Sequence, residues 1–374
     1  MPMVIERFQQ RFAGAPSLSF AQFMEFALYD EAVGFYSGTG QAGRRADFLT
    51  SPEVGPLFGA LLARRLDQLW NELDCPDPFV VVEVGAGPGT LARSIALAAP
   101  ECAAALRYVM TEISAPQRAL HADHLVGYEG EADEFHLAQF IASGESGPRF
   151  VSSEYLPAAF TGVVIANELL DNLPFDIVRH DGNSNFERLD VEFCDESFEF
   201  TPRPVDLPPE VSALLAASPA GEWLPWQHAA RLWVNATIGR ITDGSLIVID
   251  YGETKTSVLA ERQQMGWLRT FVGNERGGHP LDEPGSRDIT TDVAFDQITL
   301  DHQPSTLTTQ AEWLQGLGID ELVEEGRRLW KEKASAPDVG ALRARSRIRE
   351  AEALLESGGL GDFLWLEWRV GAGI

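Results

Sequence analysis

The residues best suited to chemistry lie in one short block, Asn167-Glu168-Leu169-Leu170-Asp171, at the end of the apolar run 162–167. If a helix starts here, Glu168 and Asp171 share one of its faces, because residues three apart are neighbours on a helix surface. Two carboxylates facing a cleft can hold a guanidinium group in its planar, bidentate geometry. Otherwise the block is a helix start that carries acids only to complement the helix dipole.

A glycine loop, Gly85-Ala86-Gly87-Pro88-Gly89, follows the apolar run 79–84. Such a run is typical of a strand covered on both faces, and glycines let the backbone turn sharply and approach a ligand. A dinucleotide fingerprint needs G-x-G-x-x-G, whereas Thr90 stands here in place of the last glycine. The G-x-G-x-G spacing resembles motif I of class I S-adenosylmethionine-dependent methyltransferases, which implies S-adenosylmethionine as cofactor rather than NAD.

Two acidic side chains accompany this loop. Glu112 ends the expected strand 107–112, about twenty residues beyond the loop. A carboxylate in this place accepts hydrogen bonds from the two ribose hydroxyls of an adenosine cofactor. Glu112 could also be a surface glutamate before a turn, but the loop upstream favours the cofactor role. For Glu83, contact with the methionine end of the cofactor and a local role in fixing the loop stay equally open.

The fold that must position these residues is indicated by alternating strands and helices, which predict an α/β protein with a mostly parallel, Rossmann-like sheet. Ligands bind beside the carboxyl ends of such strands. The last segment, 361–368, alternates apolar and polar residues in part and predicts a final antiparallel edge strand. The expected parallel strands are 79–84, 107–112, a short one near 150–153, 162–167 and 246–250.

Helices and loops are expected around this sheet. Residues 19–74 predict helix, loop, helix, with Ser19 as one N-cap candidate and Thr50 or Ser51 as the next. Residues 266–284 are expected to form a loop, and helices to follow at about 308–357. The sequence therefore predicts an N-terminal helical cap at 1–75, which contributes to the site, and a cofactor domain at 76–374 with a helical insertion at about 203–242.

Composition excludes several classes of protein. The 374 residues carry a net charge of −27, which argues against a nucleic-acid protein with a broad basic surface. Three cysteines far apart fit neither a disulfide framework nor a zinc site, and seven histidines show no metal-ligand spacing, so no metal is expected. No apolar stretch approaches the roughly 18 residues that cross a bilayer, and no signal leader is recognisable, so we expect a cytoplasmic protein.

Several separated blocks together resemble the MidA-like family of methyltransferases, and the match covers most of the chain. The mitochondrial members of this family are complex I assembly factors that methylate an arginine in a complex I subunit. In the glycine loop, Ala86 and Pro88 stand where the family commonly has proline and arginine, while the glycines remain. The matching blocks are 23–29 with 34–36, Asp47-Phe48-Leu49-Thr50-Ser51-Pro52-Glu53, 83–91, 166–174, Asp250-Tyr251-Gly252, and 284–285 with Asp288-Ile289-Thr290.

The resemblance implies a class I methyltransferase fold, S-adenosylmethionine as methyl donor and a protein arginine as acceptor, in a complex I subunit or another arginine-bearing protein. It also implies that Thr50, Ser51 and Glu53 fold over the cofactor site. Together with the residue patterns, it predicts two sets of site residues. The cofactor-binding set is Thr50, Ser51, Glu53, Glu83, Gly85, Gly87, Gly89 and Glu112, and the catalytic set is Asn167, Glu168 and Asp171.

Two rival hypotheses keep the cofactor. In one, the acceptor is a small molecule held under the tryptophan-rich part of the insertion, 223–233. In the other, the protein is an assembly factor that binds S-adenosylmethionine without turnover.

Overall fold

The chain forms two compact units, each described here by itself. The first unit comprises residues 1–48, 169–236 and 251–303, and the second comprises 49–168, 237–250 and 304–374. The structure is a computed structural model, and the residues it describes are 2–15, 17–37, 50–123, 125–183, 185–194, 197–272 and 275–371. Three residues of a block noted above, Asp47, Phe48 and Leu49, therefore lie outside the described residues.

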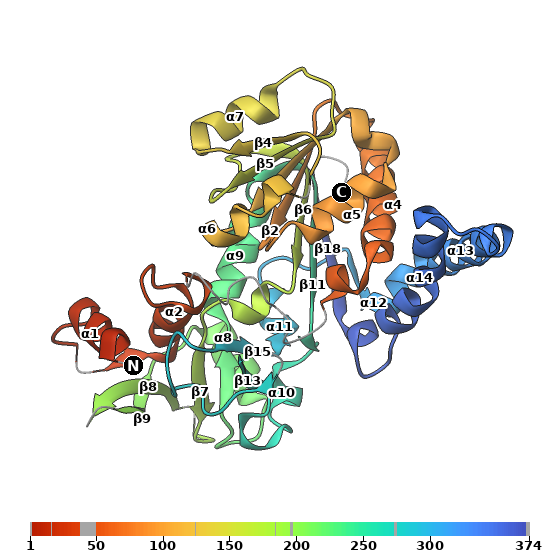
Figure 1. The fold of residues 1–374 in the computed structure, drawn as a ribbon. Helices are drawn as coiled ribbons and strands as arrows, with labels where there is room; N and C mark the ends of the chain where they lie inside the picture. The colour runs from red at the N-terminus through yellow and green to blue at the C-terminus, as the bar shows by residue number, and fades with distance from the viewer. Residues whose placement is uncertain are drawn as a thin grey trace. The chain divides into compact units, whose positions relative to one another are not determined.

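The second unit is built on a sheet of eight strands among the described residues, in the order β17-β18-β11-β6-β2-β3-β5-β4 (Figure 1). All neighbouring pairs from β11 to β4 are parallel, which confirms the predicted α/β class. The strands are β2 (Phe79–Val84), β3 (Leu106–Thr111), β4 (Tyr128–Glu131), β5 (Arg149–Ser153), β6 (Phe160–Asn167), β11 (Ile241–Asp250), β17 (Thr306–Thr309) and β18 (Leu364–Val370).

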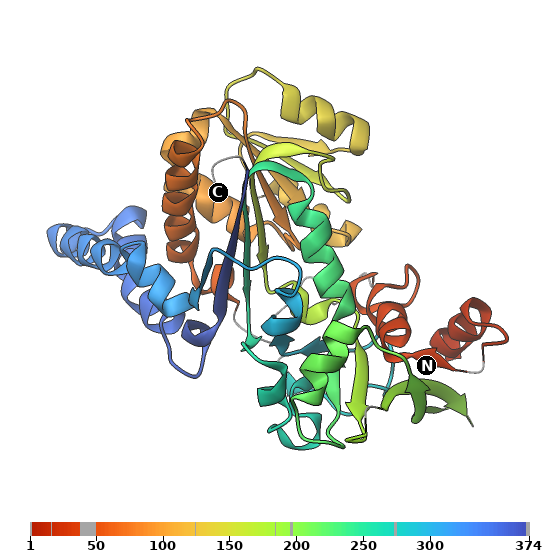
Figure 2. The ribbon, with the colours of Figure 1, turned by 180° about the vertical axis from the view of Figure 1, so that it is seen from behind.

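The reversed last strand is confirmed, because β18 runs antiparallel beside β11 (Figure 2). Its expected position at the edge is wrong. The short strand β17 pairs with the other side of β18, from Thr306 opposite Glu367 to Thr309 opposite Leu364. The backbone groups of β18 that would otherwise face solvent are thus paired within the sheet, which protects it from pairing with other chains.

One face of this sheet is covered by helices that share its core. Phe79 and Val81 of β2 belong to one buried cluster with Leu61 and Leu66 of α4. Figure 1 shows α4 and α5 side by side along this sheet. Three further helices follow β17, so the helices predicted at about 308–357 are confirmed. The helices are α4 (Pro56–Glu72), α5 (Thr90–Ala98), α12 (Gln310–Gly316), α13 (Ile319–Lys333) and α14 (Val339–Leu354).

The first unit contains antiparallel strands that sequence reasoning missed. One sheet has the order β1-β8-β7-β10 with β9 on β8, and another has the order β14-β13-β15. The loop expected at 266–284 is wrong, because β13 pairs with both β14 and β15 there. The strands are β1 (Leu18–Ser19), β7 (Asp176–His180), β8 (Phe186–Cys194), β9 (Ser197–Val205), β10 (Leu224–Trp226), β13 (Leu268–Val272), β14 (Glu275–Arg276) and β15 (Asp288–Thr291).

The insertion expected to be helical at about 203–242 is mixed. Helices α8 (Pro209–Ala216) and α9 (His228–Ile238) form there, but β10 lies between them and pairs with β7. The proline-rich start of the insertion belongs to β9, whose only strand partner among the described residues is β8. Pro202 and Pro204 are tolerated because an edge strand does not need every N–H for the ladder.

The N-terminal segment does not follow the expected division at residue 75. Helix α2 (Phe20–Tyr29), which Ser19 caps through a capping box with Gln22 as expected, lies in the first unit with α1 (Pro2–Arg11). Helix α4 lies in the second unit with the sheet. The idea that residues 1–75 form a cap over the site stays a prediction.

The helix expected after Thr50 is two helices, α3 (Ser51–Val54) with Thr50 at its N-cap, and α4. Gly55 separates them with a φ of 157°, and a Cβ there would lie 2.3 Å from the carboxyl carbon of Glu350. The Glu350 carboxylate accepts the Leu57 N–H at 2.9 Å. It thus satisfies one of the free N–H groups at the start of α4, and only a glycine leaves room for it.

A close backbone approach at the centre of the sheet generates a prediction. A Cβ on Gly162 of β6, where φ is +151°, would lie 1.9 Å from the carbonyl oxygen of Val80. Gly162→Ala is therefore expected to lower the free energy of unfolding by about 3 kcal/mol, because backbone cannot move aside. Urea denaturation measures this. Gly316→Ala, where a Cβ meets nothing within 4 Å, is the control. A loss below about 1 kcal/mol for Gly162→Ala would refute the packing argument.

Candidate functional site

The glycine loop lies between β2 and α5 of the second unit and takes the sharp turn expected. Gly85, Gly87 and Gly89 have φ values of +70°, +55° and +83°, a region that other L-residues enter only with strain. The carbonyl oxygen of Thr111, at the end of β3, accepts the N–H groups of Gly85 and Ala86 at 2.9 and 3.2 Å. The loop is thus tied to the neighbouring strand, and its conformation requires the glycines.

Glu112 follows β3 and forms a hydrogen bond with this loop. Its carboxylate accepts the N–H of Gly87 at 2.9 Å and that of Ser114 at 2.8 Å, one on each oxygen. A carboxylate has about four acceptor directions, so two remain for a vicinal diol. A Cβ on Gly87 would meet nothing within 4 Å, so the space beside the loop is open. These residues fit an adenosine-bearing cofactor, and its binding by the loop and Glu112 stays a prediction.

Glu83 is buried at the end of β2, where Tyr108 donates a hydrogen bond to its carboxyl at 2.8 Å. Burial raises the pKa of Glu83 from 4.5 to about 8, against the hydrogen bonds of Tyr108 and of the Ala92 backbone, and the charge of Glu112 adds to the rise. Glu83 therefore holds a proton at neutral pH. Its contacts with β3 and α5 favour the role of fixing the loop over that of touching the cofactor.

Asn167 and Glu168 end β6 in the second unit. Glu168 has a φ of +51° and is 8% exposed, and its N–H donates to Ile249 of β11 at 2.8 Å. Asn167 donates its side-chain amide to the Glu168 carboxylate at 3.1 Å. The Asn167 side-chain oxygen is buried. It is a hydrogen-bond acceptor that has no donor among the described residues.

The expectation that Glu168 and Asp171 share a helical face is wrong. The left-handed backbone at Glu168 prevents a helix from starting there, and only a 3₁₀ turn, Leu170–Asn172, follows. Asp171 lies in the first unit and is 4% exposed. Tyr251 donates to its carboxylate at 2.6 Å.

Beside Asp171 in the chain, Asn172 belongs to a polar cluster with Tyr36 and Asp288 in the first unit. Asn172 donates to the Asp288 carboxylate at 3.0 Å, and the Tyr36 hydroxyl lies 3.0 Å from the same carboxylate oxygen. Sequence reasoning gave these three residues no role. Their signal was present, because each stands in a block that carries the family resemblance.

Thr50, Ser51 and Glu53 are placed by α3 and α12 of the second unit. Ser51 is fully buried and donates to the side chain of Gln310 at 2.9 Å, whereas Glu53 is exposed. Ser51 thus anchors α3 to α12. A contact of these three residues with the cofactor stays a prediction.

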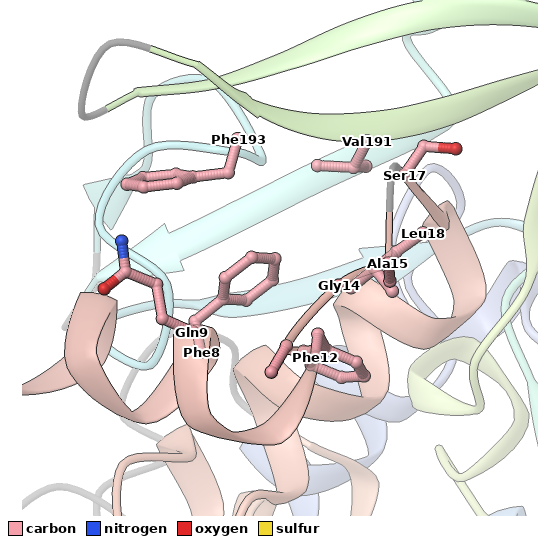
Figure 3. A pocket seen from close by; sticks show the side chains of 10 residues that line it. Phe8, Gln9, Phe12, Gly14, Ala15, Ser17, Leu18, Val191 and Phe193 are labelled. Carbon is pink, nitrogen blue, oxygen red and sulfur yellow. The ribbon is translucent and has the colours of Figure 1, made fainter.

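The first unit has a hollow of about 270 Å³ between α1 and β8. Figure 3 shows Phe8 and Phe12 facing Val191 and Phe193 across it. None of the residues that line it is titratable, so it offers no acid or base. Within the described residues, no group of three His, Cys, Asp or Glu side chains could hold a metal ion. No helix in the described ranges is long and apolar enough to cross a membrane.

A mostly parallel sheet with a reversed last strand, a glycine loop after β2 and an acid after β3 define the class of S-adenosylmethionine-dependent methyltransferases. Residues 61–311 match the family model described as "Putative S-adenosyl-L-methionine-dependent methyltransferase", and the chain belongs to this family. The resemblance to MidA-like methyltransferases is thereby confirmed. S-adenosylmethionine is the cofactor of this class.

Solved structures and curated relatives agree with this assignment. A superfamily member from Burkholderia thailandensis, crystallised with S-adenosyl-homocysteine, is 25% identical with a TM-score of 0.77, over 98% of this chain and 92% of that one. The mitochondrial "Protein arginine methyltransferase NDUFAF7 homolog" of Drosophila melanogaster is 28% identical, over 74% of this chain and 64% of that protein. Mouse NDUFAF7 is 25% identical, over 81% of this chain and 71% of the mouse protein.

These relatives overturn the expectation of a cytoplasmic protein. The matching curated proteins from fly, mouse and zebrafish are named mitochondrial. The expectation rested on the lack of a recognisable leader sequence. That lack does not establish where a protein is located.

The buried Glu83 generates a pH prediction. Between about pH 4.5 and 8 the unfolded chain releases a proton that the folded Glu83 keeps. Glu83 therefore lowers the free energy of unfolding as pH rises, by up to about 1.4 kcal/mol per unit. Glu83→Gln removes this term, so its stability relative to wild type should increase from pH 5 to pH 8 in urea denaturation. The exposed Glu199→Gln is the control. A Glu83→Gln profile parallel to wild type would show that Glu83 ionises normally.

The backbone at Glu168 generates a second prediction. A left-handed L-residue costs roughly 1–2 kcal/mol and glycine avoids this cost, so Glu168→Gly should be more stable than Glu168→Ala by about 1 kcal/mol. Both variants lose the carboxylate, so their difference isolates the strain. The same pair at Ile113, which is 57% exposed and outside the positive-φ set, is the control and should favour alanine. Denaturation midpoints that rank alanine above glycine at 168 would rule out strain.

Proposed function

We propose that this methyltransferase modifies an arginine side chain of a partner protein. The observation that carries the proposal is the burial of two carboxylates, Glu168 of the second unit and Asp171 of the first, each more than nine-tenths buried. Burying a carboxylate is costly unless an opposite charge or hydrogen bonds compensate it. A guanidinium group supplies both, because its N–H edges match carboxylates and its charge is permanent.

The hydrogen bonds at these acids suit that role. Asn167 donates to the Glu168 carboxylate and Tyr251 donates to the Asp171 carboxylate, and both donors are neutral groups. Tyr251 is itself covered by the guanidinium of Arg269, which lies 4.9 Å from the ring centre.

The chain's residues would divide the work as follows. The loop glycines and Glu112 bind the cofactor, and Glu83 fixes the conformation of the loop. Further contacts with the cofactor come from Thr50, Ser51 and Glu53. When bound, S-adenosylmethionine supplies a methyl group activated by its sulfonium. Glu168 and Asp171 bind and orient the guanidinium. A carboxylate accepts the proton that the guanidinium loses when one of its nitrogens forms a bond to the transferred methyl group and S-adenosyl-homocysteine leaves. Alignment of the two reactants supplies the main rate enhancement.

The names of the relatives support a protein arginine as acceptor, since the fly and mouse proteins are named protein arginine methyltransferases. This chain spans 64% of the fly protein, so the acceptor is part of the proposal. The family resemblance makes a subunit of respiratory complex I the first acceptor to test.

The test measures transfer of labelled methyl groups to proteins of the native host, followed by mass spectrometry for methylarginine. Glu168→Gln should lower incorporation about 100-fold while S-adenosyl-homocysteine binds within threefold of wild type. The exposed Glu199→Gln makes the same chemical change as a control and should retain full activity. Equal incorporation by wild type and Glu168→Gln would remove Glu168 from the mechanism.

The position of the label separates the rival functions. Label in methylarginine of a protein supports the proposal, whereas label in the low-mass fraction indicates a small-molecule acceptor. Calorimetric binding of S-adenosylmethionine without label in either fraction indicates a binding factor without turnover.

A further inference from the structure

We propose that His121 is a positioning residue, which fixes the Gly87 carbonyl and so holds the cofactor loop in its binding conformation. His121 lies beyond Glu112 in the second unit, at the start of a 3₁₀ turn, and is fully buried. Its Nε2 is 2.7 Å from the carbonyl oxygen of Gly87. The inference concerns cofactor binding and holds whatever the methyl acceptor is.

A chain of hydrogen bonds continues behind the imidazole. Its Nδ1 is 2.6 Å from the hydroxyl of Ser152 in β5, which is 3.0 Å from the hydroxyl of Tyr128 in β4. Ser152 is fully buried and Tyr128 partly so. The side chains of Tyr128, Ser152 and His121 therefore link β4 and β5 to the loop after β2.

The chemistry of these groups sets the direction of the chain. A carbonyl oxygen can only accept, so Nε2 must carry the proton. In a neutral imidazole Nδ1 is then an acceptor, which takes the Ser152 hydroxyl proton, and the Ser152 oxygen accepts from Tyr128. Every donor points toward the loop, an order in which neighbouring hydrogen bonds strengthen one another. The Gly87 carbonyl thus sets the tautomer, and Ser152 supplies the donor that Nδ1 then requires.

Gly87 is held on both of its peptide groups. Glu112 accepts its N–H and His121 donates to its carbonyl. The imidazole also packs under Gly89, where an added Cβ would lie 3.1 Å from the ring carbon Cδ2. A loop fixed in this way does not have to be ordered when the cofactor binds, so His121 raises affinity for the cofactor and its product alike.

Two amide variants separate positioning from mere packing. The amide nitrogen of His121→Gln stands near the place of Nε2 and can donate to Gly87. That of His121→Asn stands near the place of Nδ1, so it faces Ser152 and does not reach Gly87. Both leave a polar group in the same buried site, so their costs in folding stability should be similar.

The expected result is a loss of S-adenosyl-homocysteine affinity of about tenfold for His121→Asn and less than threefold for His121→Gln, by isothermal titration calorimetry. In turnover, the KM for S-adenosylmethionine should rise in His121→Asn while kcat at saturation stays within twofold. Equal affinities of the two variants, or a loss in kcat alone, would overturn the proposal.

A second measurement covers the case in which the asparagine variant does not fold. Nitrogen NMR of the wild-type protein without cofactor should show His121 as the Nε2–H tautomer. Ser152→Ala removes the hydroxyl donor to Nδ1 but keeps the Gly87 carbonyl, so it should retain the Nε2–H tautomer and weaken S-adenosyl-homocysteine binding about threefold. An Nδ1–H tautomer in the wild type would overturn the proposal. The calorimetric and NMR readouts need no methyl acceptor, so they stand apart from the Glu168 experiment.

Discussion

The hydrogen bond from the Gly87 N–H to the Glu112 carboxylate is the interaction on which the cofactor end of the second unit depends. It joins the end of β2 to the end of β3, two strands paired in parallel from Phe79 opposite Leu106 to Val84 opposite Thr111. That register brings a loop and a carboxylate together although 25 residues separate them. Arg118 secures the far side, since its buried guanidinium donates to the backbone carbonyls of Glu112 and Ile113 at 2.8 and 2.9 Å.

Charge limits how many acids this end of the sheet can hold. Glu83, Glu112 and Glu168 are all buried in one unit of a protein with a net charge of −27. Like charges in a medium of low dielectric repel strongly, and the simplest relief is protonation of one member. Glu83 is the protonated member, because burial and the charge of Glu112 keep it neutral at pH 7. Glu112 is then free to serve as an acceptor beside a neutral neighbour.

The parallel sheet and glycine loop could be predicted because their signals are local. Continuous apolar runs mark β2, β3 and β6, and loop glycines are needed where φ is positive. One antiparallel pair of the first unit was missed because its strands are distant in sequence, with Leu18 of β1 opposite Val191 of β8. The helical face at 168–171 failed for a different reason. Residue spacing reports helical neighbours only if the backbone is helical, and Glu168 is not.

The backbone of Glu168 is the clearest case in which the fold opposes local preference. Pairing of β6 with β11 extends to Asn167 opposite Ile249, and the Glu168 N–H bonds to Ile249 one residue further. The sheet therefore dictates where the strand ends and forces the next residue to turn sharply. Glycine would make that turn without strain, and an apolar residue would avoid burying a carboxylate. Strain of this kind gathers where geometry serves function, so a glutamate that carries both costs supports the proposed role of its carboxylate.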